Sequence, residues 1–381
     1  MQQGICHLSL YQFRNYQALN LEVSPGPVVL AGPNGAGKTN ILEAISLFAP
    51  GRGLRGDKLS EITCHSHADQ LGILWAASLR LDDETQLSTG LEKTAQGTEK
   101  RVYKIHGESV KGQGYLAEWL NILWLTPAVD RLFLEAPTMR RKFVDRLIYA
   151  QDPLHAERLH RYEQVLRERL FVLKNQKDPR WLSGLEEQLA SLGVAIAIAR
   201  HQLMQKLTQG QQYLHPLFPR FYTTMAGEVD EWIKNYSATE MESKLAEAFH
   251  QHRHADQESG TTKYGPHRSD WQVIHQLKNI SADQASTGEQ KILLAAVILS
   301  FIHAKTRQDP RLTILLLDDV IAHLDFHHRV VLFEQICALQ TQQDRCSHVQ
   351  TWLTGTDALL FETLIGQAQF FMIDQATITP G

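Results

Sequence analysis

One segment of the chain has the residue types and spacing of a phosphate-binding loop. It reads Gly32-Pro33-Asn34-Gly35-Ala36-Gly37-Lys38-Thr39, which matches the pattern G-x-x-x-x-G-K-[ST]. In such loops the glycines let backbone N–H groups surround phosphate oxygens, the lysine reaches the outer phosphates, and the threonine hydroxyl ligates Mg²⁺. An ordinary glycine-rich turn is the alternative. A strand pattern before the loop and a helix pattern after it favour a nucleotide site.

Two adjacent carboxylates are the second candidate for chemistry. Asp318 and Asp319 follow the apolar run Leu312–Leu317, which has the character of a buried strand. At the end of such a strand, Asp318 would hold the Mg²⁺ shell and Asp319 would orient or activate an attacking water. Two acids could equally close a strand and cap the next turn. The phosphate-binding loop elsewhere in the chain favours the catalytic interpretation.

A third segment begins a long apolar helix pattern. Ser286 and Glu289 have the spacing of a capping box, which predicts a helix from Ser286 to about Ala304. A serine and a glycine at an exposed helix N-terminus, here Ser286 and Gly288, also form an anion site.

The elements that must position these residues lie at both ends of the chain. Strand patterns cover 1–31 and 71–105, a helix pattern runs over Lys38–Phe48, and strands and helices alternate again after residue 264. Residues 127–255 instead carry leucines at three- and four-residue spacing, as helices do. The pattern predicts an α/β head built from 1–126 and 256–381, split by a mainly helical lobe over 127–255.

The order of the three segments resembles the ATP-binding-cassette (ABC) class of ATPases. A finer resemblance, to the RecF family of bacterial repair ATPases, is carried by segments spread over nearly the whole chain. They are Phe13–Tyr16, Gly32–Ala44, Pro137–Asp145, Tyr264–Asp270, Ala285–Lys291 and Leu315–Asp319.

The resemblance implies an ABC-type P-loop ATPase head with a mixed sheet, and the ligands ATP and Mg²⁺. It also implies an ATP-dependent homodimer in which Ser286 and Gly288 of one subunit complete the phosphate site of the other. Arg14 and Asn15 are implied to bind the nucleotide. Such proteins are cytoplasmic, bind DNA near single-strand gaps, help load RecA together with RecO and RecR, and support the SOS response.

Several positions differ from the patterns that the resemblance implies, among them Ser269, where the family commonly has Asp, and Glu289, where it often has Gln. Ala322-His323 replaces a usual Ser-Glu in the loop that communicates between the two sites, and Asp319 stands where transporters usually have the longer Glu. The shorter side chain predicts slow turnover, with ATP acting more as a clamp than as fuel. The segment Gln350–Asp357 lacks the switch histidine of transporters, so Thr354 or Thr356 is the candidate neighbour of the γ-phosphate.

Charge is distributed unevenly along the chain. The whole chain has a net charge of −4, whereas residues 140–180 carry eleven Lys and Arg against six Asp and Glu. That asymmetry favours a surface that contacts DNA phosphates, with Arg140 and Arg141 as candidates and Arg52 and Arg55 in the loop Gly51–Gly56 as a second patch. A charge run on a helix is also often just a solvated face. We find no base-reading motif, so binding should follow the nucleic-acid backbone.

Other classes of protein fit the chain less well. No apolar run approaches the roughly 18 residues of a membrane helix, and the start lacks the features of a signal peptide. The four cysteines form no C-x-x-C pair. A transporter subunit would need a much shorter spacing between the phosphate loop and Ser286, and an SMC-like structural protein would need long heptad arms. An ATPase-coupled nuclease would need more acids after residue 326.

Overall fold

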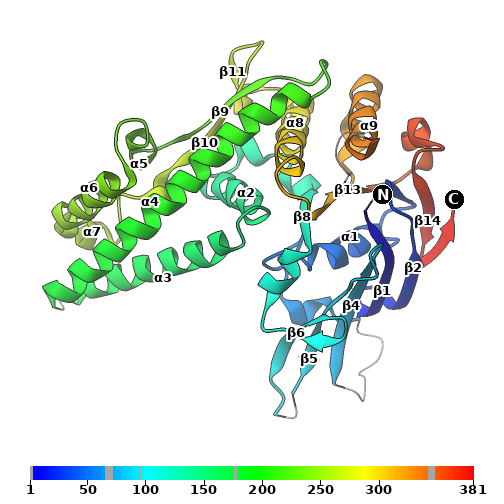
Figure 1. The fold of residues 1–381 in the computed structure, drawn as a ribbon, viewed down its shortest axis with the longest axis horizontal. Helices are drawn as coiled ribbons and strands as arrows, with labels where there is room; N and C mark the ends of the chain where they lie inside the picture. Colours follow the sequence, from blue (N-terminus) through cyan, green and yellow to red (C-terminus); the bar gives the residue numbers. More distant parts are fainter. Residues whose placement is uncertain (1–2, 65–71, 95, 176–177, 342–347) are drawn as a thin grey trace. The chain divides into compact units, whose positions relative to one another are not determined.

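The computed structural model describes residues 3–64, 72–94, 96–175, 178–341 and 348–381 (Figure 1). The chain forms two compact units. Unit 1 comprises Met1–Arg131, Tyr213–Phe218 and Thr287–Gly381, and unit 2 comprises Leu132–Gln212 and Pro219–Ser286. Leu71, where the second predicted strand region starts, lies outside the described residues.

Unit 1 contains two six-stranded sheets, one mixed and one antiparallel. The mixed sheet has the order β15-β14-β3-β13-β12-β8, and β14, β3, β13, β12 and β8 run parallel. Its strands are β3 (Val28–Ala31), β8 (Leu120–Leu125), β12 (Leu312–Leu317), β13 (Val349–Gly355), β14 (Gln369–Asp374) and β15 (Thr377–Pro380). The antiparallel sheet, in the order β2-β1-β4-β5-β6-β7, contains β1 (Ile5–Phe13), β2 (Tyr16–Glu22), β4 (Ile73–Leu81), β5 (Gln86–Lys93), β6 (Glu99–Ile105) and β7 (Glu108–Ser109). The helices of unit 1 are α1 (Lys38–Ser46), α8 (Thr287–Thr306) and α9 (Phe326–Thr341).

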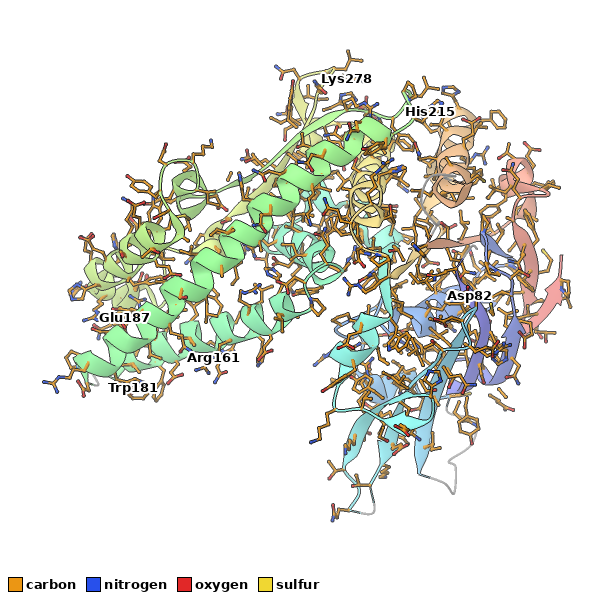
Figure 2. The ribbon with its side chains drawn as sticks, viewed as in Figure 1. Asp82, Arg161, Trp181, Glu187, His215 and Lys278 are labelled. Carbon is orange, nitrogen blue, oxygen red and sulfur yellow. The ribbon has the colours of Figure 1, made fainter. Side chains whose placement is uncertain are left out.

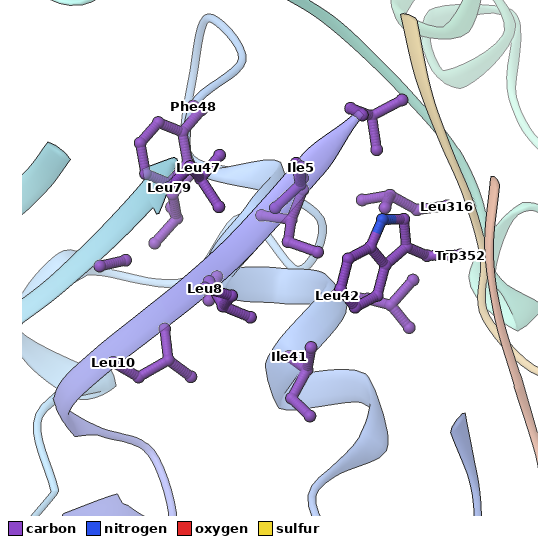
Figure 3. Packing of buried hydrophobic residues seen from close by; sticks show 14 of the residues in the cluster. Ile5, Leu8, Leu10, Ile41, Leu42, Leu47, Phe48, Leu79, Leu316 and Trp352 are labelled. Atoms are coloured by element: carbon purple, nitrogen blue, oxygen red, sulfur yellow. The ribbon is translucent and has the colours of Figure 1, made fainter. Parts of the chain in front are cut away.

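One hydrophobic core joins both sheets of unit 1 to α1 (Figure 3). Leu8 and Leu10 come from β1, Ile41 and Leu42 from α1, and Trp352 from β13, and each is at most 2% exposed. Four-residue β3 is buried at every position, as expected for a central parallel strand. Because α1 packs against strands of both sheets, the loop that precedes it is anchored at both of its ends.

Unit 2 is mainly helical and also contains a small sheet. Its helices are α2 (Pro137–Tyr149), α3 (Leu154–Lys174), α4 (Pro179–Gly210), α5 (Glu228–Trp232), α6 (Ala238–Gln251) and α7 (Arg253–Ser259). Its antiparallel sheet has the order β11-β10-β9, with β9 (Phe221–Ala226), β10 (Asp270–His275) and β11 (Ile280–Ser281). The unit therefore runs to Ser286, beyond the predicted boundary at residue 255, because β10 pairs with β9 and β11 pairs with β10.

Helix α4 is the central helix of unit 2. Asp178 caps its N-terminus by accepting from the Arg180 N–H at 2.8 Å, and Pro179 takes the first helical position. It is the one helix of the described residues that is long and apolar enough to cross a membrane by length and composition alone. Half of its most apolar stretch is buried, against α3 and α6, as in the core helix of a globular unit.

Arg169 of α3 is a fully buried cation in unit 2. Its guanidinium donates to Glu186 at 3.0 Å, to Asp256 at 2.7 Å and to the Phe249 carbonyl at 2.7 Å. Glu186 also pairs with Arg253 at 2.6 Å. A buried charge is tolerated only when its donors are satisfied, so this cluster ties α3, α4, α6 and α7 together.

We expect Arg169→Ala to lower the free energy of unfolding by about 3–5 kcal/mol, because it leaves the buried carboxylate of Asp256 without its cation and leaves Glu186 paired with Arg253 alone. The matched control is Arg167→Ala, on the exposed side of the same helix, which should change it by at most about 0.5 kcal/mol. Urea denaturation of the two variants measures both values. Equal midpoints would show that the cluster does not stabilise unit 2.

Candidate nucleotide-binding site

The loop between β3 and α1 has a backbone that only glycine accommodates at two positions. Gly32 has φ +150°, and a Cβ there would lie 2.0 Å from the Ile373 carbonyl oxygen. Gly37 has φ +117°, and its Cβ would lie 2.5 Å from the Tyr16 hydroxyl. The Lys38 ammonium group donates to the carbonyls of Gly32 at 2.6 Å and Pro33 at 2.8 Å. The loop therefore curves back on itself as phosphate-binding loops do, and the Lys38 ammonium group bridges its first two residues.

The carboxyl ends of three neighbouring parallel strands carry the polar groups of the site. Strand β13 lies between β3, which leads to Lys38 and Thr39, and β12, which leads to Asp318. Asp318 Oδ1 accepts from the Thr39 hydroxyl at 2.8 Å and from the Thr354 hydroxyl, also at 2.8 Å. Ligands of open α/β sheets bind at this edge. Of the two threonines considered from the sequence, Thr354 is the one at the site, whereas Thr356 is exposed.

These groups surround one cavity of about 230 Å³. Its lining consists of Asn34, Gly35, Gly37, Lys38, Thr39, Asn40, Arg55, Pro127, Asp318, Asp319 and Thr354. Burial lowers the pKa of Lys38 from its ordinary value, while the carboxylates of Asp319 and Asp318 oppose that shift. The structure thus brings together the predicted loop and both predicted carboxylates.

Arg14 and Asn15, both expected at the nucleotide, do not line this cavity. The Arg14 guanidinium donates to both oxygens of buried Glu43, at 2.8 and 2.5 Å, and to Asp57 at 2.6 Å. The Asn15 amide donates to the Ala36 carbonyl at 3.3 Å and accepts from Asn40 at 2.6 Å. Both residues therefore hold α1 and the phosphate loop in place, and their contact with a nucleotide stays a prediction.

The structure places Arg55 at the phosphate cavity, although its sequence context suggested DNA contact. Its guanidinium donates to Glu43 at 2.9 Å and also forms part of the lining. Arg52, three residues earlier, is exposed. The sequence does not show which of Arg52 and Arg55 lies at the cavity, because no sequence motif links Glu43 to the loop Gly51–Gly56.

Arg140 and Arg141, the other candidates for DNA contact, make internal contacts in unit 2. Arg140 pairs with both oxygens of Asp270 at 2.7 Å, and Arg141 donates to the Ser269 carbonyl at 2.7 Å. The two arginines thus join α2 to the start of β10. The net charge of a segment cannot distinguish a structural guanidinium from an available one.

Other cations in the same stretch are solvent-exposed. Arg161 on α3 is one of them, labelled in Figure 2, and its guanidinium lies 3.3 Å from the Gln188 amide oxygen. Lys177 lies outside the described residues. The exposed cations that the structure describes between residues 140 and 180 are Lys142, Arg161, Arg167, Lys174 and Arg180.

The helix with the serine-glycine start is α8, which begins at Thr287, one residue after Ser286. Ser286 and Gly288 are both exposed. One turn further on, the buried Lys291 pairs with Asp130 at 2.5 Å. The start of α8 is thus tied to the turn after β8, where Pro127 lines the phosphate cavity.

The fold and this cavity define an ATPase head of the P-loop type, with two sheets around the helix that follows the phosphate loop. Residues 4–360 match a protein family described as the RecF/RecN/SMC N terminal domain.

Relatives with known names define the family more closely. The protein named DNA replication and repair protein RecF from Mesorhizobium japonicum is 38% identical over 382 residues, covering 100% of this chain and 98% of the relative. The protein of the same name from Agrobacterium fabrum is 38% identical over 381 residues, covering 99% and 98%. The chain therefore belongs to the RecF family.

A solved structure shows the same fold over the full length. It is that of the recombination mediator protein RecF-ATPrS in the RecFOR pathway, with a TM-score of 0.83 and 22% identity, covering 100% of this chain and 98% of that one.

The position of Arg55 leads to a binding prediction. Arg55→Ala should weaken the affinity for a nucleoside triphosphate roughly tenfold, as expected for the loss of a charged hydrogen-bond donor. Arg52→Ala, in the same loop but exposed, should leave the affinity within about twofold. Titration with a fluorescent, non-hydrolysable analogue of ATP measures both. Equal affinities for the two variants would remove Arg55 from the phosphate site.

Proposed function

We propose that the chain is an ATP-gated DNA-binding protein of recombinational repair and replication restart, with a slow ATPase. The observation that carries the proposal is the cavity in which the phosphate loop, Asp318 and Asp319 meet. Support also comes from the RecF names of full-length relatives at 38% identity.

The residues at the cavity suit a magnesium nucleotide. Mg²⁺ prefers oxygen ligands and is often bound by one or two protein groups together with phosphates. The Thr39 hydroxyl and the Asp318 carboxylate, 2.8 Å apart, would hold it. When bound, the ion neutralises negative charge on the phosphates.

The chain's own groups supply the remaining chemistry. Backbone N–H groups of the loop and the Lys38 ammonium group bind the phosphates, and Arg55 adds a second cation. Asp319 orients a water for attack on the γ-phosphate. Because aspartate is one methylene shorter than the glutamate of transporters, the water is held less closely and turnover is slow. In this proposal ATP binding closes the dimer and ATP hydrolysis opens it again.

The second half of the proposed site comes from another copy of the chain. Ser286 and Gly288 are exposed at the start of α8, and a helix N-terminus favours anions. In the proposed homodimer these residues close over the phosphates held by Lys38 and Thr39 of the partner copy. The ion pair between Lys291 and Asp130 holds the start of α8 against the turn after β8. Phosphate binding by Ser286 and Gly288 would therefore position α8 as a whole.

The proposed macromolecular ligands are duplex and gapped DNA. The exposed cations on α2, α3 and α4, together with Arg52, supply charge for backbone contacts without reading sequence. We place the protein in the cytoplasm, in a pathway with RecO and RecR that loads RecA at single-strand gaps and supports SOS induction. The solved RecF structure with the same fold is that of a recombination mediator in the RecFOR pathway, which supports this proposal.

ATP hydrolysis should respond to DNA if this proposal holds. We expect turnover below about 10 s⁻¹, the median for enzymes, and stimulation by duplex or gapped DNA. Lys38→Met supplies the blank, because it removes the cation at the mouth of the loop. Phosphate release is measured with no DNA, with duplex and with gapped duplex.

If neither duplex nor gapped DNA stimulates ATP hydrolysis, the result would argue against the repair function and for a different macromolecular ligand. Turnover well above the median would contradict the clamp role of ATP.

A further inference from the structure

Asp319 has a backbone conformation that residues with a side chain rarely adopt. Its φ and ψ are +51° and +23°, in the left-handed region. A Cβ makes this region unfavourable, and residues kept there at functional sites are held by their surroundings. Asp319 directly follows Asp318, the proposed Mg²⁺ ligand, and directly precedes the short 3-10 helix Val320–His323. Aspartate is among the side chains that tolerate this region best, so one hydrogen bond to its backbone is enough to fix the peptide there.

The hydroxyl of Thr354 makes that hydrogen bond. It accepts a hydrogen bond from the Asp319 N–H at 2.9 Å and donates one to Asp318 Oδ1 at 2.8 Å. The directions follow from the partners, because an amide can only donate and an ionised carboxylate can only accept. Thr354 is 1% exposed, so water has little access to these bonds.

The position of Thr354 in the sheet explains why it reaches both carboxylates. Strand β13 pairs with β3 on one side, where Thr354 faces Leu30, and with β12 on the other, where Leu353 faces Leu317. Thr354 therefore stands at the carboxyl end of the strand between the phosphate loop and the carboxylate strand. Its branched Cβ restricts χ1 and so limits where the hydroxyl can point.

We propose that Thr354 is the positioning residue of the hydrolytic carboxylate. It holds the Asp319 backbone in the left-handed conformation and thereby sets where the Asp319 side chain stands in the cavity. Thr39 has a different role, because its hydroxyl belongs to the phosphate-binding loop itself. The proposal rests on the proposed ATPase function and assigns a residue to its hydrolytic step rather than to nucleotide binding.

Thr354→Val tests the assignment, because valine keeps the shape and removes the hydroxyl. We expect kcat for ATP hydrolysis to fall about tenfold, the size expected for losing a hydrogen bond to a charged group. KM, and the Kd of a non-hydrolysable ATP analogue, should stay within about twofold, since the phosphate loop is intact. Thr354→Ser restores the hydroxyl and should recover most of kcat.

A second buried threonine on the same strand is the matched control. Thr351 is 0% exposed, and its hydroxyl has no hydrogen-bond partner among the described residues. Thr351→Val should therefore hydrolyse ATP like the wild type. Thermal unfolding of all three variants accompanies the kinetics.

The outcomes separate this proposal from the function on which it rests. A wild-type kcat in Thr354→Val would overturn the positioning role while leaving the ATPase function in place. An equal loss of nucleotide affinity and kcat, not recovered by Thr354→Ser, would reduce Thr354 to a structural residue. A wild-type protein that does not hydrolyse ATP would remove the proposed function itself, and the positioning role with it.

Discussion

A single carboxylate oxygen, Asp318 Oδ1, connects the parts of the chain that form the site. It accepts hydrogen bonds from the hydroxyls of Thr39 and Thr354, which stand at the ends of two different elements. Thr39 and Asp318 are separated by 279 positions in the sequence. The site therefore exists only when both ends of the chain share one sheet, and this constraint explains why the insertion between them must return the chain to that sheet.

Burial makes this arrangement stiff. Helix α1 contributes to the same core as β1, β12 and β13, so the phosphate loop cannot shift without disturbing close packing. Buried Glu43, on α1, binds Arg14 and Arg55 from two separate segments. The charge of Arg55 is thereby held at the cavity by a carboxylate outside it. A bound triphosphate would compete for the same guanidinium.

Much of the site was predictable because its constraints are local. Gly32 and Gly37 are required by backbone geometry that a sequence pattern records, and the apolar strand ending at Asp318 predicts both burial and direction. The roles of Arg140, Arg141 and Arg55 were not predictable. Each depends on one distant carboxylate or carbonyl, in Asp270, Ser269 or Glu43, and charge counts carry no information about such pairs.

Dependence on distant partners also explains why the extent of unit 2 could not be predicted from the sequence. Strands β9, β10 and β11 are short and lie on either side of three helices, so the sequence pattern predicts a mainly helical lobe that ends at residue 255. Only their pairing extends unit 2 to Ser286. The importance of Thr354 likewise depends on which strand lies in the middle, and strand order is a property of the folded sheet.

If nucleotide binding controls DNA binding, as we propose, DNA affinity must differ between the nucleotide-free and the nucleotide-bound protein. Fluorescence anisotropy of a labelled gapped duplex, titrated with protein at fixed salt, gives the Kd without nucleotide, with ADP, and with a non-hydrolysable ATP analogue. We expect the ATP analogue to tighten DNA binding at least about tenfold, or roughly 1.4 kcal/mol of coupling, and we expect Lys38→Met to abolish the difference. Equal affinities in all three states would contradict the proposal.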